Sequence, residues 1–392
     1  MKAKPWDVIV LGVGGMGSAA LYHLARRGQR VLGLEQFGIA HEMGSSHGLT
    51  RIIRLAYYED PAYVPLLCRS YELWRELESG AGEQLLHICG SLDCGPANDE
   101  IFTASLQSCI EHGLEHEALG NAEISARWPA YRFPADTMGL FQPEGGFLLP
   151  EACIRAHVNA AQASGAELHT DVRVREWQVR PGGLVELRTD DAAYLAQRLV
   201  ISAGAWAGQF LPELDTVAIP ERQVLVWLQP QEPAHFKAER FPVFNCLVDE
   251  GRYYGFPDFA GQGFKFGRYH HLDEPADPDT LDRERISAAD KRVLLQFAQR
   301  YFPTGAGPAL LYKVCMFTNT PDEHFIIDHH PQHEQVCFAA GFSGHGFKFA
   351  SVVGEILADL ALQGSTRHDI DFLRADREMI PLATAGPSNT TN

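Results

Sequence analysis

The sequence lacks a hydrophobic run long enough to cross a membrane. Of its 392 residues, 45% are hydrophobic and 21% are charged, which is typical of a globular protein. No apolar run reaches the roughly 18 residues that a spanning helix needs. The N-terminus, MKAKPWDVIVLGVGG, has a basic start and an apolar run but no small-residue cleavage site. We therefore expect a cytoplasmic protein without a membrane partner.

Basic residues are also scarce. The chain has 33 lysines and arginines against 50 acidic residues, giving a formal net charge of −17. Nucleic acids and anionic membrane surfaces would be repelled by such a chain. Small molecules remain the expected partners.

Paired cysteines are missing as well. None of the eight cysteines forms a C-x-x-C pair, so a structural zinc site is poorly supported and no metal is expected. In a cytoplasmic chain the default for each is a reduced, buried thiol. Cys315 stands out because Lys313 precedes it and histidines and acidic residues follow. The residues alone leave it as a core thiol, a metal ligand, a nucleophile or an attachment point.

The N-terminal segment predicts a nucleotide-binding unit. An apolar run at 7–11 leads into GVGGMG, a segment with helical spacing, and a second apolar run that ends at Glu35. Gly12, Gly14 and Gly17 permit a tight turn, close approach of a pyrophosphate, and close helix packing. Glu35 is placed to accept hydrogen bonds from the ribose hydroxyls, which disfavours NADP. The pattern does not decide between FAD and NAD.

Length and the order of patterns predict two domains of a mixed α/β fold. A Rossmann-like FAD-binding domain is expected at 1–85, 146–220 and 322–385, and an inserted, mainly antiparallel β substrate domain at 86–145 and 221–321. Residues 386–392 read as a disordered tail. The alternation at 167–179 predicts a hairpin, with Val174 at the end of a strand.

Three further patterns carry candidate site residues. Arg51 and Arg54 are three apart, so on a helix or turn they would point the same way, unless they are simply solvated. Lys265 stands between two phenylalanines, and its local pattern favours an exposed lysine on an edge strand. The late turn GFSGHG lies between a strand and a helix, whose N-terminus would face the cleft.

These segments resemble the monomeric sarcosine oxidase family, which includes N-methyltryptophan oxidase, among the D-amino-acid-oxidase-like flavoproteins. The resemblance spans nearly the whole chain. Its most specific matches are GSSHGLTRIIR, YYGFP, KVCMFTNTPDEHFIID and GFSGHGFK.

The resemblance implies FAD joined to the Cys315 sulfur through an 8α-S-cysteinyl bond, and Lys313 nearby would favour the thiolate. It places Arg51 over the isoalloxazine ring and Lys265 over the opposite flavin face, where oxygen is reduced. The turn with Gly344 and Gly346, leading to Lys348, would face the flavin, and Val174 would contact the adenine part.

The resemblance also implies a substrate pocket. Arg54 and Lys348 match the pair that binds the substrate carboxylate, and Tyr254 and His345 match pocket residues. His270 is expected to be the pocket histidine, although an extra residue in RYHH allows Tyr269 or His271 instead.

The implied reaction is oxidation of a secondary amine by O₂, in a monomer, with sarcosine as the first expected substrate. Sarcosine-specific members have methionine and tyrosine where this chain has Asn245 and Phe317, and both positions border the pocket. N-methyl-L-tryptophan is therefore a close alternative. Fructosyl amino acids, pipecolate and proline are further alternatives, and an NAD-dependent dehydrogenase is the alternative from another class.

Overall fold

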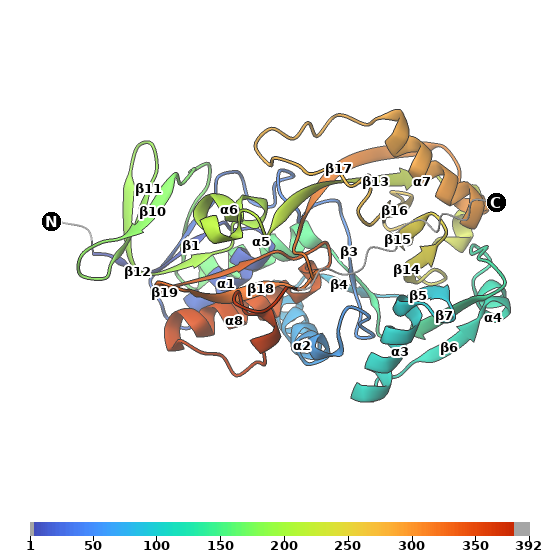
Figure 1. Ribbon diagram of the computed structural model, residues 1–392, viewed down its shortest axis with the longest axis horizontal. Helices are drawn as coiled ribbons and strands as arrows, with labels where there is room; N and C mark the ends of the chain where they lie inside the picture. Colours follow the sequence, from blue (N-terminus) through green and yellow to red (C-terminus); the bar gives the residue numbers. More distant parts are fainter. Residues whose placement is uncertain (1–3, 380–392) are drawn as a thin grey trace.

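The computed structural model describes residues 4–379, so the predicted tail at 386–392 lies outside the described residues. Two large sheets lie side by side along the long axis of the molecule (Figure 1). The predicted mixed α/β class is confirmed. Within the described range, no helix combines the length and the apolar character that a membrane span requires.

The first sheet is parallel at its centre. Its strands in spatial order are β10 (Glu176–Val179), β11 (Val185–Arg188), β12 (Ala193–Ile201), β1 (Trp6–Leu11), β2 (Val31–Leu34) and β9 (Glu167–His169), with β19 (His333–Ala340) beside β12 and β18 (Ile326–His330) beside β19. The start of β12 pairs with β11 and its end pairs with β19. Because β1, β2, β9, β12 and β19 run parallel, their carboxyl ends meet at one edge.

Alternate residues of β1 enter two different cores. Val8 and Val10 belong to the core shared with the helices, and Ile9 and Leu11 to the core on the other face. Burial on both faces explains the continuous apolar run of this strand. The helices of the first core are α1 (Gly15–Arg26), α2 (Val64–Ala81), α5 (Pro150–Ala163) and α8 (Ala350–Gln363).

The second sheet is antiparallel except where β14 meets β5. Its strands in spatial order are β17 (Ala309–Asn319), β13 (Ile219–Leu228), β16 (Phe264–Arg268), β15 (Gly251–Phe256), β14 (Val243–Val248), β5 (Ser91–Pro96), β7 (Thr137–Gln142) and β6 (Glu117–Gly120). The helices of this half are α3 (Glu100–His112), α4 (Asn121–Arg127) and α7 (Ala288–Tyr301). The long pair β13 and β17 reaches toward the first sheet (Figure 1).

Short elements complete the fold. A small sheet contains β3 (Arg51–Ile53), β8 (Gly146–Leu148) and β4 (Leu86–Ile88). One short helix, α6 (Ala207–Phe210), packs on the outer face of the first sheet. The 3-10 helices are η1 (Pro61–Tyr63), η2 (Gly204–Trp206), η3 (Pro212–Leu214), η4 (Pro233–His235), η5 (Pro303–Gly305), η6 (Phe347–Phe349) and η7 (Asp371–Leu373).

The hairpin predicted at 167–179 is wrong. The first half of that segment, β9, pairs in parallel with β2, and the second half, β10, pairs with β11. Val174 lies between them in irregular backbone, because the chain must turn from one side of the sheet to the other. The division into two domains stays a prediction, although β13 already begins two residues before the expected boundary at 221.

Candidate active site

The glycine turn after β1 has the close contacts that the sequence predicts. Gly12 has φ +85°, and a Cβ there would lie 2.6 Å from the Ser202 carbonyl oxygen. A Cβ on Gly17 would lie 1.8 Å from the Gly12 carbonyl oxygen, so helix α1 can approach the turn only with glycine there. At Gly14 a Cβ would meet no atom within 4 Å, because the backbone borders open space.

Glu35 directly follows β2, beside this turn. Its carboxylate accepts hydrogen bonds from the backbone N–H of Val13 at 2.8 Å and of Phe37 at 3.1 Å. The backbone carbonyl of Glu35 accepts from the Val172 N–H at 2.9 Å, which brings the irregular segment with Val174 alongside. Glu35 therefore has the position that the βαβ pattern predicts.

A cavity begins at the glycine turn and extends toward the second sheet. Predicted cofactor residues that line it are Gly12, Gly14, Glu35, Arg51, Val174, Gly344 and Gly346, and Phe317, predicted to bind the substrate, also lines it. One end is thus bordered by the turn before α1, and the other by β17 and the late glycine turn. The predicted residues that do not line it are Gly17, Arg54, Asn245, Tyr254, Lys265, His270, Cys315, His345 and Lys348.

Cys315 lies in β17 opposite Gln223 of β13 and is buried. Its Sγ is 3.8 Å from Arg51 Nη2 and 3.8 Å from the Ser45 carbonyl oxygen, and both of those residues line the cavity. Lys313 instead forms an ion pair with Glu42. The cation beside this sulfur is therefore Arg51, not Lys313 as the sequence suggested.

The two predicted arginines do not point the same way. Arg51 belongs to strand β3, and its guanidinium donates to the carbonyl oxygens of Ser45 and Thr50 at 2.7 and 2.9 Å. Arg54 follows the strand and is directed into the second half of the molecule, where Nη2 lies 2.8 Å from Glu59 Oε2. Residues three apart on a strand face opposite sides. The helix or turn alternative is wrong, and so is the solvated one, because Arg54 is 1% exposed.

His345 and Lys348 lie near the same carboxylate, Glu59. His345 Nδ1 is 2.5 Å from the Tyr57 hydroxyl, and its Nε2 is 2.9 Å from the Glu323 carbonyl oxygen. A carbonyl oxygen can only accept, so Nε2 carries the proton and Nδ1 accepts. Burial lowers the pKa of His345 to about 4, which agrees with a neutral ring.

Lys348 lies in η6, at the start of the late helix. Its Nζ donates to the His345 carbonyl oxygen at 2.6 Å. Burial lowers its pKa to about 7, and the nearby Glu59 carboxylate opposes that shift. Glu59 itself has its pKa held at about 2, because the charges of Arg54 and Lys348 and the hydrogen bond from Arg54 outweigh its burial.

Lys265 is buried, which contradicts the edge-strand expectation. Strand β16 pairs with β13 on one side and β15 on the other. The Lys265 ammonium group donates to the Gly48 and Thr50 carbonyl oxygens at 2.6 and 2.8 Å and to Thr50 Oγ1 at 2.9 Å. These contacts fix it against the segment that precedes Arg51. Burial, with Arg51 nearby, lowers its pKa well below that of a free lysine.

Tyr254, Tyr269 and Phe317 form an aromatic group. The Tyr269 ring centroid lies 4.9 Å from that of Tyr254 and 5.8 Å from that of Phe317. Gly344 makes room for this group, since a Cβ there would lie 2.5 Å from the Phe317 ring. Asn245, the other expected wall residue, is 1% exposed and donates to Asp93 at 2.7 Å.

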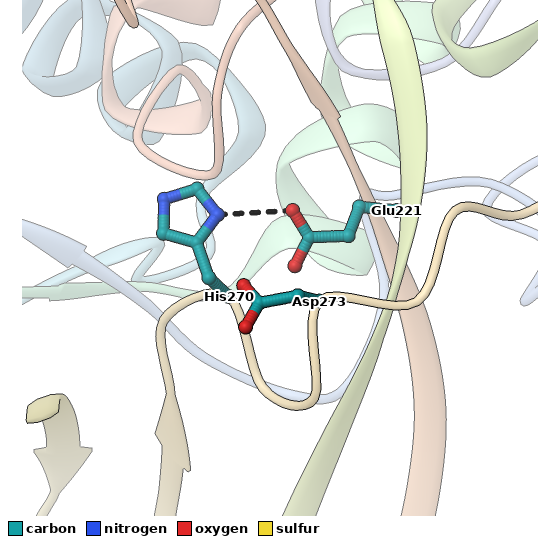
Figure 2. A group of neighbouring side chains, drawn as sticks. All are labelled: Glu221, His270 and Asp273. Carbon is teal, nitrogen blue, oxygen red and sulfur yellow. Dashed lines mark hydrogen bonds and ion pairs between the residues drawn. The ribbon is translucent and has the colours of Figure 1, made fainter. Parts of the chain in front are cut away.

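His270 lies apart from that aromatic group. Its Nδ1 is 2.9 Å from Glu221 and its Nε2 is 2.8 Å from Glu323 (Figure 2 draws the first of these). The ligand atoms of Glu221, His270 and Asp273 lie within 4.8 Å of one another. Both ring nitrogens are bonded to carboxylates, which raises the His270 pKa to about 9. The geometry is that of an imidazolium joining two carboxylates, and it leaves no ring nitrogen for a metal.

Sequence reasoning missed three residues of this region, Tyr57, Glu59 and Asp93, and named Tyr269 only as an alternative. Tyr57 and Glu59 belong to RLAYYED, directly after Arg54, and this continuation of a quoted motif was a usable signal. Asp93 is a charged residue inside the otherwise uncharged strand SLDCGP. Tyr269 was one of the alternatives to His270.

The cavity suits a dinucleotide cofactor such as FAD. Open space at Gly14 and the N-terminus of α1 fit a pyrophosphate. Glu35 and Val174 border the same end, where they fit the adenosine part. At the other end, the space is bordered by the turn at 341–347, by Arg51, and by Met316 and Phe317, which follow Cys315 in β17.

Comparisons with known proteins agree with this geometry. The family model described as FAD dependent oxidoreductase matches residues 7–360. The monomeric sarcosine oxidase of Bacillus sp. (strain B-0618) is 43% identical over 376 residues, which is 95% of this chain and 96% of that protein. The N-methyl-L-tryptophan oxidase of Yersinia pestis (strain Pestoides F) is 33% identical over 369 residues, covering 93% and 97%.

A solved structure has the same fold. NikD, an unusual amino acid oxidase essential for nikkomycin biosynthesis, matches with a TM-score of 0.82 and 25% identity over 95% of this chain and 98% of that one. The family model selects FAD over NAD as the cofactor. The chain belongs to the FAD-dependent oxidoreductase family and, within it, to the group of the monomeric sarcosine oxidases and N-methyltryptophan oxidases.

Proposed function

We propose that this protein oxidises the N-methyl group of small amino acids, with sarcosine as its first substrate. The observation that carries the proposal is the pair of buried cations, Arg54 and Lys348, which both lie close to Glu59. Lys348 directly follows Phe347, which lines the cofactor cavity. Buried cations can bind a carboxylate strongly because little water competes there. The aromatic group with Tyr254 and Tyr269 provides an apolar place for the rest of a small substrate.

The chemistry divides between the cofactor and the chain. Bound FAD would supply the electron acceptor, taking a hydride equivalent from the N-methyl carbon and passing both electrons to O₂. Arg54 and Lys348 would hold the substrate carboxylate, and the neutral His345 would keep the adjacent wall uncharged. For sarcosine, one O₂ and one water are consumed, and glycine, formaldehyde and H₂O₂ are formed.

Covalent attachment of the flavin to Cys315 is part of the proposal. The Cys315 sulfur lies 3.8 Å from Arg51 Nη2 and 3.8 Å from the Ser45 carbonyl oxygen, and both of those residues line the cavity. The wild-type protein should stay yellow after denaturation and precipitation, and its 315-containing peptide should carry the flavin mass. Cys315→Ser should release its colour into the supernatant. Cys337→Ser, at a buried thiol in β19, is the matched control and should keep its flavin. Colourless wild-type pellets would contradict the attachment.

The substrate choice is tested by flavin absorbance under anaerobic conditions. Sarcosine, N-methyl-L-tryptophan and N-methylethanolamine, which lacks a carboxylate, are added separately to the yellow protein. We expect bleaching by sarcosine and none by N-methylethanolamine, because Arg54 and Lys348 require an anion. Bleaching by N-methyl-L-tryptophan alone would show that the protein prefers bulky substrates. The cause would then be sought in Asn245 and Phe317, which replace the methionine and tyrosine of the sarcosine-specific members. Pipecolate, proline and a fructosyl amino acid are tested in the same way, as the remaining alternative substrates.

We further propose a cytoplasmic monomer. The high negative charge favours solubility and disfavours self-association. Sedimentation of the purified protein at micromolar concentration should give the mass of one chain, and a larger mass would contradict this.

A further inference from the structure

Arg54 has two carboxylates beside it rather than one. Its Nη2 lies 2.8 Å from Glu59, and its Nε lies 3.7 Å from Asp93. The side chain of Asp93 is 1% exposed, like that of Arg54. A single buried guanidinium would be neutralised by Glu59 alone. The proposed binding of a substrate carboxylate requires positive charge here, so it does not explain the second carboxylate, Asp93.

Asp93 is held in position by donors from two other elements. Asn245 of β14 donates to its Oδ1 at 2.7 Å, and Ser105 of α3 donates to its Oδ2 at 3.1 Å. Asn245, expected to border the substrate, is thus occupied with Asp93. These contacts place Asp93 beneath Arg54, on the side formed by β5, β14 and α3.

The charges around the two cations decide what Asp93 does. With Lys348 protonated and Asp93 ionised, the charges of Arg54, Lys348, Glu59 and Asp93 sum to zero, so an incoming carboxylate adds a net negative charge in a buried place. With Asp93 neutral, the sum is higher by one, and the carboxylate adds one negative charge less to the same place. Buried charge without a partner is costly. Binding of the anion should therefore favour the neutral form of Asp93.

We propose that Asp93 is a positioning residue that orients Arg54 and couples binding of the substrate carboxylate to the uptake of one proton. This inference rests on the proposed function. Ionised Asp93 weakens the hold of Arg54 on carboxylate ligands, and protonated Asp93 strengthens it. Burial raises the pKa of Asp93, which Arg54 and Asn245 partly oppose, so the residue is able to change charge state.

Other charged or titratable groups also face this place. They are Glu59 from the segment after β3, Cys94 on the same strand, Asp99 and Cys109 from the α3 side, and Lys348 from η6. Lys348, with a pKa of about 7, will also change anion binding with pH. The Asp93 carboxylate raises the Lys348 pKa, so Asp93→Asn makes Lys348 less protonated and partly offsets the tightening. The expected tightening is the net result of these two effects.

The test measures binding of methoxyacetate, a carboxylate with the shape of sarcosine and no amine. Its dissociation constant is measured from the perturbation of the flavin spectrum and, independently, by calorimetry, for the wild type and Asp93→Asn between pH 6 and 9. We expect Asp93→Asn to bind about tenfold tighter at pH 8, from the loss of one nearby charge. The two proteins should converge only as the pH falls through the pKa of Asp93, which burial raises. The limiting rate of flavin reduction by sarcosine should change by less than about threefold.

Equal or weaker binding by Asp93→Asn at every pH would overturn the inference, because a merely structural role predicts that result. If Asp93→Asn does not fold, Ser105→Ala serves instead. It removes one donor to Asp93, so its binding should tighten at pH 8 by a smaller factor, and unchanged binding would overturn the inference. Asp258→Asn, at a buried carboxylate paired with Lys237, is the matched control and should bind methoxyacetate as the wild type does.

Failure of the wild type to bind methoxyacetate would overturn both this inference and the proposed function. Oxidation of sarcosine without an effect of Asp93→Asn on binding would overturn the inference alone.

Discussion

The position of the Lys265 ammonium group is fixed by its neighbours. Its three oxygen partners belong to Gly48 and Thr50, so the ammonium group is fixed rather than free to move. The Phe256 ring centroid is 4.2 Å from Nζ, which adds a cation–π contact. A fixed cation lowers the barrier to a step in which negative charge develops, as it does when O₂ accepts an electron.

Lys265→Met should therefore slow reoxidation more than reduction. We expect reoxidation by O₂ to slow by roughly a hundredfold, in the range found for loss of one fixed electrostatic group. Anaerobic reduction by sarcosine should change far less. Stopped-flow absorbance measures the two half-reactions separately. Lys237→Met, which removes a lysine paired with Asp258, is the control and should leave both rates unchanged. Equal slowing of both half-reactions by Lys265→Met would contradict the role.

Single residues were predicted well only where a motif or a close contact fixes them. Gly12 and Gly17 were predictable because any side chain would collide with nearby backbone. Lys265 was not predictable from its local pattern, since exposure depends on which strands pair with β16. His270 and Tyr269 could not be separated by sequence, because the turn that follows β16 decides which ring faces Phe317. Asp93 was missed because its partners, Asn245 and Ser105, are distant in sequence.

At the scale of elements, the order of helices and strands along the chain was easier to predict from the sequence than the pairing of strands in the sheets. The β1–α1–β2 unit follows from an apolar run, glycines and a helical pattern that lie next to one another. The hairpin at 167–179 failed because alternation shows that strands exist but not which neighbours they choose. Here β9 and β10 sit at opposite edges of the first sheet. Parallel pairing is set by distant segments, and no local pattern records it.

The β3 segment shows the same limit. A spacing of three brings two arginines together on a helix and separates them on a strand. Because of this separation, Arg51 borders the cofactor cavity and Arg54 contacts Glu59. Strand β3 and the residue after it therefore supply one arginine to the cofactor site and one to the proposed substrate site.

At the scale of the whole molecule, buried histidines predict how stability responds to acid. Burial lowers the pKa of His23 to about 4, of His157 to about 3 and of His345 to about 4. In the unfolded chain each has a pKa of about 6.5. Between these values the unfolded chain binds more protons than the folded one, so the free energy of unfolding falls as the pH decreases through that window. His270 has the opposite shift, and its contribution is fully present below pH 6.5 and lost as the pH rises toward 9.

His157 gives the cleanest test, because it packs between Tyr22 and Trp74 and has no hydrogen-bond partner at Nδ1. Lowering the pH from 6.5 to 5 should cost about 2 kcal/mol of unfolding free energy through this residue alone, at 1.36 kcal/mol per pH unit and proton. His157→Leu should therefore lose less stability over that range than the wild type, as measured by urea unfolding at each pH. His112→Leu, at an exposed histidine, is the control and should follow the wild type. If His157→Leu and the wild type lose the same stability between pH 6.5 and 5, then His157 is protonated in the folded protein, and the acid response must come from other groups.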